Sequence, residues 1–242
     1  MKLKGGVIVI GSLIWEDHLK EKDNDFIRRD WRVQNLFSNP KLTPVPIRYG
    51  RKSSSRSDTY TMVFSKSNEN ALGQGLILEF RESINSFEDL ERQAIALAIA
   101  EGIYTTANTR ISSMWGSVGL LINPALKKIN FSKFEFLKEK WTDIYQSYYK
   151  IFFATGYKCD EDVEPPINQN GMLTINWQDA MNDFDLLIAT PVIPDPKRIL
   201  SPREITDKMI NNKYQKYFRN NLAHDIKTCQ DNQILELLTN RG

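Results

Sequence analysis

Apolar and polar positions along the first half of the chain form blocks that predict short strands. The first block, Val7 to Ile10, has four consecutive β-branched residues, which is typical of a strand buried on both faces. Two further strands are predicted for residues 59–64 and 75–80, on either side of a polar connection. Gly11 and Ser12 follow the first strand directly, so we expect a tight turn there, whose amides can point into a pocket.

The strongest helical pattern spans residues 87–101. Its apolar residues recur at helical spacing: Phe87, Leu90, Ala94, Leu97 and Ala98. Ser86 with Asp89 supplies a start signal and Gly102 a stop signal. Residues 94–100 are apolar almost all the way round, so we expect this helix to be deeply buried.

The second half of the chain predicts longer helices and fewer strands. We expect a strand at 117–122, an amphipathic helix at 134–152, a buried strand at 184–192 and a final helix that begins at Ser201 and continues to Ile226. Strands and helices without regular βαβ alternation favour an α+β architecture. At 242 residues, the chain is expected to form one elaborated domain.

Charge and residue counts narrow the class of protein. The 32 basic and 30 acidic residues give a formal net charge of +2, which does not favour a nucleic-acid binder. The chain has two cysteines and two histidines and no CxxC pair, so we expect reduced thiols. These counts do not favour a disulfide framework or a metal site. The opening apolar run is too short for a signal peptide or a membrane span, so we expect a cytoplasmic protein.

Three short motifs carry a resemblance to a known family. The stretch Gly11-Ser12-Leu13-Ile14-Trp15 resembles the glycine-serine-leucine signature of the γ-glutamylcyclotransferase-like proteins, especially the glutathione-degrading, ChaC-like branch. Thr43-Pro44-Val45-Pro46 resembles the threonine-proline segment before that branch's next strand, and Glu101-Gly102 closes a helix as the family's catalytic glutamate does. The family usually has tyrosine before the glycine, where this chain has Ile10.

The resemblance implies a fold, a reaction and a set of site residues. Residues 1–124 would form a small, mostly antiparallel β-barrel flanked by helices. Residues 125–242 would be a helical elaboration with one returning strand, packed on the core as a single domain. The implied enzyme cyclises a γ-glutamyl amine, amino acid or peptide such as glutathione to 5-oxoproline, and it requires no cofactor or metal. Glu101 would be the general acid and base, and the turn Gly11, Ser12, Leu13 and Ile14 would bind the small-molecule substrate.

Part of the interpretation of Glu101 comes from the pattern itself. One more turn of the apolar face of the helix at 87–101 reaches Glu101. Burial makes the charged form of a carboxylate costly, which suits proton transfer near neutral pH. The alternative is a structural carboxylate bonded to nearby amides or to an arginine.

A basic stretch from Arg48 to Arg56 is the second candidate for substrate binding. Its cations, Arg51 among them, can receive carboxylates or phosphates, since arginine offers forked donors. A solvated surface loop is the alternative. Trp15, Trp31 and Trp115 could line a pocket, although aromatic residues belong more often to the core. The stretch leaves open divergent lyase or transferase chemistry on another anionic or nucleotide-like ligand, and a non-enzymatic binding protein is a third interpretation.

Overall fold

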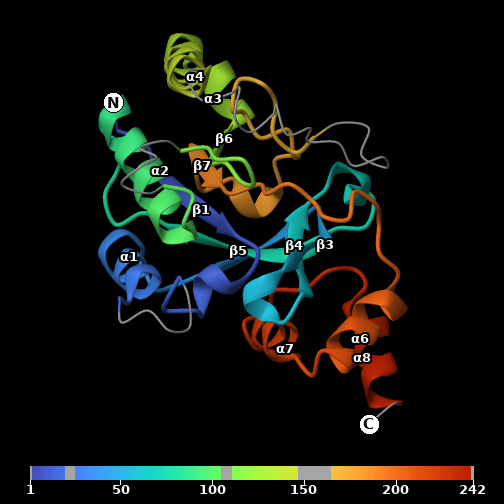
Figure 1. The fold of residues 1–242 in the computed structure, drawn as a ribbon. Coiled ribbons are helices and arrows are strands. Elements are labelled where there is room, and N and C mark those ends of the chain that lie inside the picture. The colour runs from blue at the N-terminus through green and yellow to red at the C-terminus, as the bar shows by residue number, and fades with distance from the viewer. Residues whose placement is uncertain (1, 20–24, 105–110, 147–164, 241–242) are drawn as a thin grey trace.

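The computed structural model describes residues 2–19, 25–104, 111–146 and 165–240, and it has an α+β architecture (Figure 1). The strands are β1 (Gly5–Val9), β2 (Lys41–Val45), β3 (Ile47–Ser53), β4 (Thr59–Phe64), β5 (Gly73–Glu79), β6 (Gly119–Ile122) and β7 (Leu186–Ala189). Five of them form one sheet in the order β2-β5-β1-β7-β6, and β3 and β4 form a two-stranded sheet. The β1–β7 pair is parallel and the other pairs are antiparallel.

The predicted first strand is β1, at the centre of the larger sheet. It pairs with β5 on one side and with β7 on the other, and all five of its residues are buried. Burial on both faces explains why this strand is an unbroken apolar run in the sequence. Because β1 and β7 run parallel, their C-terminal ends lie at the same edge of the sheet.

The two sheets are connected through β2 and β3, which follow one another across Pro46. β2 pairs with β5, β3 pairs with β4, and a single bridge joins Arg51 of β3 to Asp195 after β7. The strands of the described residues do not close into a barrel, so the predicted barrel is not confirmed. The coarser α+β prediction is confirmed.

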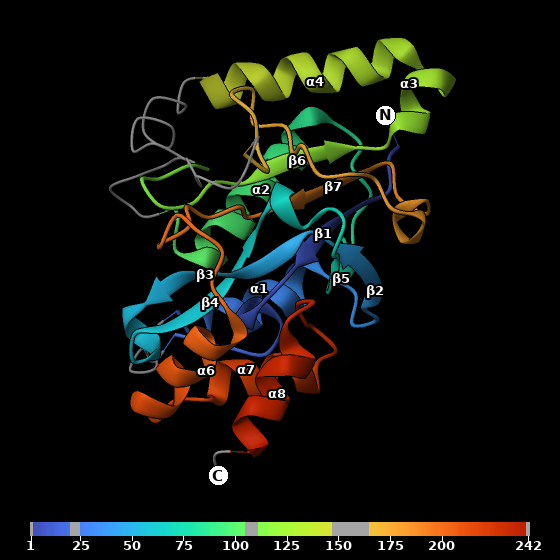
Figure 2. The same cartoon turned by 90° about the vertical axis from the view of Figure 1, so that its right-hand side faces the viewer.

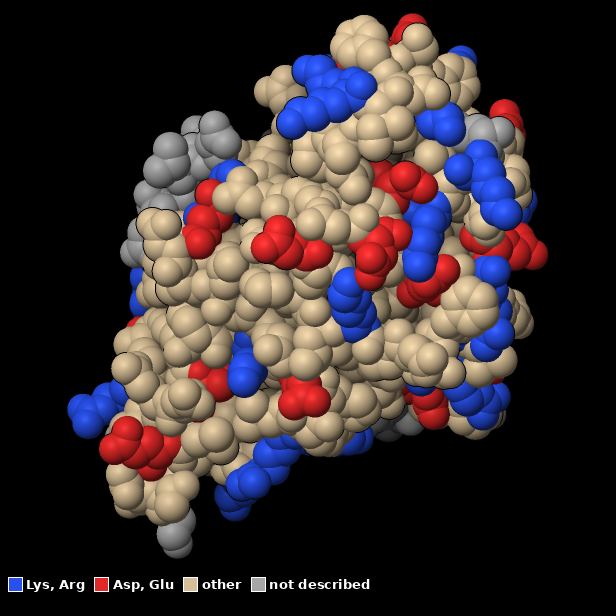
Figure 3. All heavy atoms as spheres, turned by 180° about the vertical axis from the view of Figure 1, so that it is seen from behind, with Lys and Arg blue, Asp and Glu red and all other residues tan. Residues whose placement is uncertain are grey.

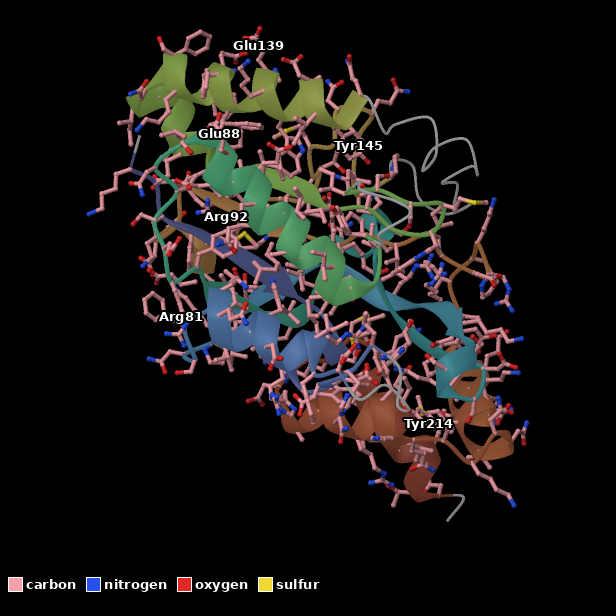
Figure 4. The ribbon with its side chains drawn as sticks, turned by 60° about the vertical axis from the view of Figure 1, so that its left-hand side comes forward. Arg81, Glu88, Arg92, Glu139, Tyr145 and Tyr214 are labelled. Atoms are coloured by element: carbon pink, nitrogen blue, oxygen red, sulfur yellow. The ribbon has the colours of Figure 1, made fainter. Side chains whose placement is uncertain are left out.

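The helices cover one face and both ends of this framework. The helices are α1 (Ile27–Asn35), α2 (Phe87–Glu101), α3 (Pro124–Ile129), α4 (Phe131–Gln146), α6 (Pro202–Asn211), α7 (Lys216–Ala223) and α8 (Asp231–Thr239). α1 and α2 lie together on one face of the strands (Figures 1 and 4). α3 and α4 form one end of the molecule and α6–α8 the opposite end, as Figure 2 shows. Single turns of 3-10 helix are η1 (Ser12–Ile14), η2 (Ser54–Arg56), η3 (Lys66–Asn68) and η4 (Asp179–Met181).

The bounds predicted for α2 are confirmed, and both ends are capped as expected. The Ser86 side chain accepts from the Asp89 amide, and the Asp89 side chain accepts in return from the Ser86 amide. Gly102 adopts φ 76°, the left-handed conformation that ends a helix and that glycine reaches without strain. These local signals place Glu101 in the last turn of α2.

Three predictions about elements need correction. The basic stretch at 48–56 is mostly strand β3, because Arg48 to Lys52 pair with β4 in a ladder that a charge pattern does not reveal. The final helix is broken into α6 and α7 around Lys213, which has φ 51°. The helix predicted at 134–152 begins earlier, at Phe131 of α4, and its end beyond residue 146 lies outside the described residues.

Buried apolar side chains from both halves of the chain form one continuous core, which includes Leu3, Leu186 and Phe218. On the surface, acidic and basic side chains are interspersed over the face shown in Figure 3. None of the helices in the described part of the chain has the length and apolar character that crossing a bilayer requires.

Candidate functional site

A cavity of about 590 Å³ lies where β1 ends. Its walls come from the end of β1 with η1, the C-terminus of α2, β3 and β4 with η2, and the segment that follows β7. The polar and aromatic side chains that line it include Ser12, Arg28, Arg51, Arg56, Glu101, Trp115, Thr190 and Tyr217. A cavity of this size is within the usual range for small-molecule sites.

The turn after β1 lines this cavity and has two backbone amides that are not used. In η1, the Trp15 amide donates to the Ser12 carbonyl at 3.1 Å, and the Ile14 amide donates to the Gly11 carbonyl at 3.4 Å. The Ser12 and Leu13 amides have no acceptor among the described residues, and both residues line the cavity. Two adjacent unused amides at a turn form an anion-binding concavity.

Glu101 lies across the same cavity, and its side chain is 21% exposed. Thr190 donates to its Oε1 at 2.9 Å, and the Arg28 guanidinium lies 3.5 Å from its Oε2. These contacts orient the carboxylate while one of its sides remains open to the cavity. Glu101 is therefore half-buried at the cavity wall, less enclosed than the apolar pattern of α2 predicts.

Arg28, which the sequence analysis missed, connects the turn to α2. This buried side chain of α1 donates to the Ala100 carbonyl at 3.0 Å and to the Ser12 hydroxyl at 3.1 Å, and it also pairs with Glu16. Arg56 of η2 donates to the same Ser12 hydroxyl at 2.7 Å and to Glu16 at 2.6 Å. Glu16 therefore balances two guanidinium groups, and together these contacts hold the turn in place.

Arg51 of β3 lines the cavity with a different set of contacts. Its guanidinium donates to the Ile193 carbonyl at 2.9 Å and lies 5.3 Å from the centre of the Trp115 ring. It forms no ion pair with a described carboxylate. Burial lowers its pKa from the ordinary value of an arginine, while the charge of Asp195 acts in the opposite direction. A partly desolvated cation of this kind favours an anionic ligand beside it.

Tyr217, from α7, is the second residue that the sequence analysis missed. Its hydroxyl accepts from the Met62 amide at 3.1 Å, and its ring packs edge-on against Trp15 with centroids 6.2 Å apart. A Cβ built on Gly11 would lie 2.6 Å from the Tyr217 hydroxyl oxygen, so this turn requires glycine. Tyr217 therefore places a hydroxyl group beside the turn, whereas Ile10, the residue before Gly11, has none.

The cavity brings together most of the predicted site residues. Gly11, Ser12, Leu13, Arg51 and Glu101 line it, whereas Ile14 is not among the lining residues and packs against the core. The assignments of these residues to binding and catalysis stay predictions. Of the missed residues, Arg28 had a sequence signal, because its three-residue spacing from Trp31 places both on one face of α1. Tyr217 had no sequence signal beyond its place on an apolar helix face.

The chemistry that this arrangement supports is proton exchange beside an anion-binding turn. The carboxylate of Glu101 can accept and return a proton, and the Ser12 and Leu13 amides with Arg51 can hold a negative or polarised oxygen. Among the described residues no group of three or more histidine, cysteine, aspartate or glutamate side chains could hold a metal ion.

Comparisons of the chain with models of known protein families, with curated proteins and with solved structures gave no match.

Proposed function

We propose that this protein is a γ-glutamylcyclotransferase-like enzyme, which releases 5-oxoproline from a γ-glutamyl amine, amino acid or peptide. One observation carries the proposal: the Glu101 carboxylate and the unused amides of Ser12 and Leu13 line the same cavity. These elements are far apart in the sequence, and the resemblance joins them in one site. The arrangement is therefore independent support for reading two of the three motifs, the turn at Gly11 and the helix end at Glu101, together.

In the proposed reaction the α-amine of the γ-glutamyl group attacks its own side-chain carbonyl carbon. A new C–N bond closes the five-membered ring, and the original C–N bond to the rest of the substrate breaks. Glu101 takes the proton from the attacking nitrogen and returns it to the leaving nitrogen, so no water, oxidant or cofactor is consumed. The turn amides face the oxygen that becomes negative, and holding the chain folded favours the intramolecular attack.

The strand arrangement agrees with an opened form of the barrel that the resemblance implies. The bridge between Arg51 and Asp195 connects β3 to the segment after β7, and β2 returns to β5. β5, β1, the β7 segment and the continuous β2–β3 are thus linked in a circuit that includes one isolated bridge and one chain connection. We propose that this circuit corresponds to the barrel of the γ-glutamylcyclotransferase-like fold.

The proposal is tested by measuring 5-oxoproline release from a panel of γ-glutamyl amines, γ-glutamyl amino acids and glutathione. We expect Glu101→Gln to lower the rate by roughly 10²-fold or more, because the amide keeps the contact with Thr190 but cannot exchange a proton. Glu91→Gln is the matched control, since Glu91 lies on the same helix and does not line this cavity.

Two outcomes contradict the proposal at different levels. Full activity of Glu101→Gln removes Glu101 from the mechanism. Release from no γ-glutamyl compound removes the substrate class.

A second candidate is lyase or transferase chemistry on a phosphorylated, nucleotide-like ligand, favoured by Arg28, Arg51 and Arg56 at one cavity. Glu16 already pairs with Arg28 and Arg56, which leaves Arg51 as the guanidinium without a carboxylate partner among the described residues. One such cation suits a carboxylate better than a polyphosphate. Thermal stabilisation by nucleotides, without any by γ-glutamyl compounds, would favour the second candidate.

A further inference from the structure

The hydroxyl of Tyr217 is a donor that the described part of the chain leaves unused. Its oxygen accepts from the Met62 amide, but no acceptor among the described residues takes its hydrogen. The residue is only 5% exposed, and the open space beside it is the cavity at the end of β1. Buried hydroxyl groups normally donate as well as accept, so an unused donor at a cavity wall indicates a ligand.

The Tyr217 ring is held firmly in this position. It packs against Trp15, and the Arg56 guanidinium lies 5.1 Å from its centroid. Asn221, one turn later on α7, accepts from the Trp15 indole at 2.8 Å, which ties α7 to the turn. A hydroxyl fixed by contacts on several sides costs little to orient when a ligand binds.

The protonation of Tyr217 suits a donor. Burial raises its pKa above the ordinary 10.0, and the charge of Glu101 acts in the same direction. The positive charge of Arg56, the hydrogen bond from the Met62 amide and the nearby Asn221 side chain oppose this shift without cancelling it. The hydroxyl therefore keeps its hydrogen at neutral pH.

We propose that Tyr217 donates this hydrogen to the substrate oxygen that the Ser12 and Leu13 amides face, so that the C-terminal helices complete the active site. This inference rests on the proposed function and deepens it. In the cyclisation, a third fixed donor would stabilise the oxygen as it becomes negative. Tyr217 would thus be a catalytic residue supplied by α7, outside the first half of the chain that carries the family resemblance.

The test compares Tyr217→Phe with Tyr214→Phe in the 5-oxoproline assay. Tyr214, which is labelled in Figure 4, precedes α7 and does not line the cavity. We expect Tyr217→Phe to lower kcat by roughly 10²-fold with little change in KM, since the lost contact strengthens only in the transition state. Tyr214→Phe should keep the activity of the unaltered protein.

A further variant separates donation from packing. With 3-fluorotyrosine at position 217, the ring and the donor both remain, so we expect kcat to recover relative to Tyr217→Phe at equal melting temperature. Equal kcat in Tyr217→Phe and the unaltered protein overturns the inference and leaves the proposed function standing. Failure of fluorotyrosine to restore kcat also overturns it, because packing alone would then explain the loss. If the unaltered protein and Tyr214→Phe both release no 5-oxoproline, the proposed function fails, and this inference fails with it.

Discussion

The contact between Gly11 and Tyr217 shows how one residue controls the shape of the site. Gly11 has φ −171°, an extended conformation open to any residue, so its backbone does not explain the need for glycine. The explanation is space, because a methyl group at Gly11 would meet the Tyr217 hydroxyl oxygen at 2.6 Å. The next atom of that ring, Cζ, would be at 3.5 Å, an ordinary van der Waals distance.

We therefore expect Gly11→Ala to lower the free energy of unfolding by about 2 kcal/mol, which is typical of overpacking a buried contact. Chemical denaturation measures this change. The Gly11→Ala/Tyr217→Phe pair should recover part of the loss, since removing the hydroxyl removes the close contact. Strict additivity of the two substitutions would show that the clash does not occur.

The docking of α8 shows how an element is held by a buried carboxyl group. Asp231 begins the helix and is 1% exposed, and its Oδ1 accepts from the Thr228 hydroxyl at 2.5 Å. Its other oxygen has no partner at hydrogen-bond distance among the described residues. Burial raises the pKa of Asp231 from 3.8 to about 6, although the hydrogen bond from Thr228 and the nearby Tyr49 hydroxyl act in the opposite direction.

This raised pKa predicts a loss of stability as the pH increases. The folded protein binds the proton of Asp231 more tightly than the unfolded chain does. The resulting stabilisation is complete below about pH 4 and is lost as the pH rises through about 6, amounting to about 3 kcal/mol. Asp231→Asn should remove this component, so that the variant gains stability relative to the unaltered protein between about pH 4 and about pH 7.

Urea denaturation at several pH values measures the difference between Asp231→Asn and the unaltered protein. Glu236→Gln, an exposed position on the same helix, is the matched control and should show no such component. A stability difference that stays constant over this pH range would contradict the assignment to Asp231.

At the scale of the whole molecule, the C-terminal helices and the sheets share one core. Phe218 and Ile234 are buried in the same cluster as β1, and Gln74 of β5 exchanges backbone hydrogen bonds with Lys227. The chain ends lie at opposite ends of the molecule (Figures 1 and 2). Contacts of this kind connect residues 1–124 to residues 125–242 throughout the described parts of the chain.

We therefore expect the protein to unfold in a single cooperative transition. Helix loss followed by circular dichroism and tryptophan exposure followed by fluorescence should give the same midpoint, because the described residues of both regions share one core. Two calorimetric transitions would show instead that the C-terminal region unfolds independently.

The sequence by itself determined the elements whose signals are local. The capping residues, the apolar repeat and Gly102 predict the bounds of α2, since each signal acts within a turn or two of the helix. The β-branched run likewise predicts β1, because burial on both faces requires uninterrupted apolar residues. For the same reason, the sequence could identify the turn at Gly11 and the carboxylate at Glu101 separately.

Only the tertiary structure decided which of these residues meet and which others join them. Arg28 and Tyr217 reach the cavity from segments that look like solvated or amphipathic surface, because their partners lie far away along the chain. The strand β3 was hidden for a related reason, since its basic residues are paired by backbone hydrogen bonds with β4 that side-chain charge does not report. The local sequence pattern therefore identified the motifs, whereas long-range strand pairing and burial, which depend on the whole fold, decided which residues surround them in the site.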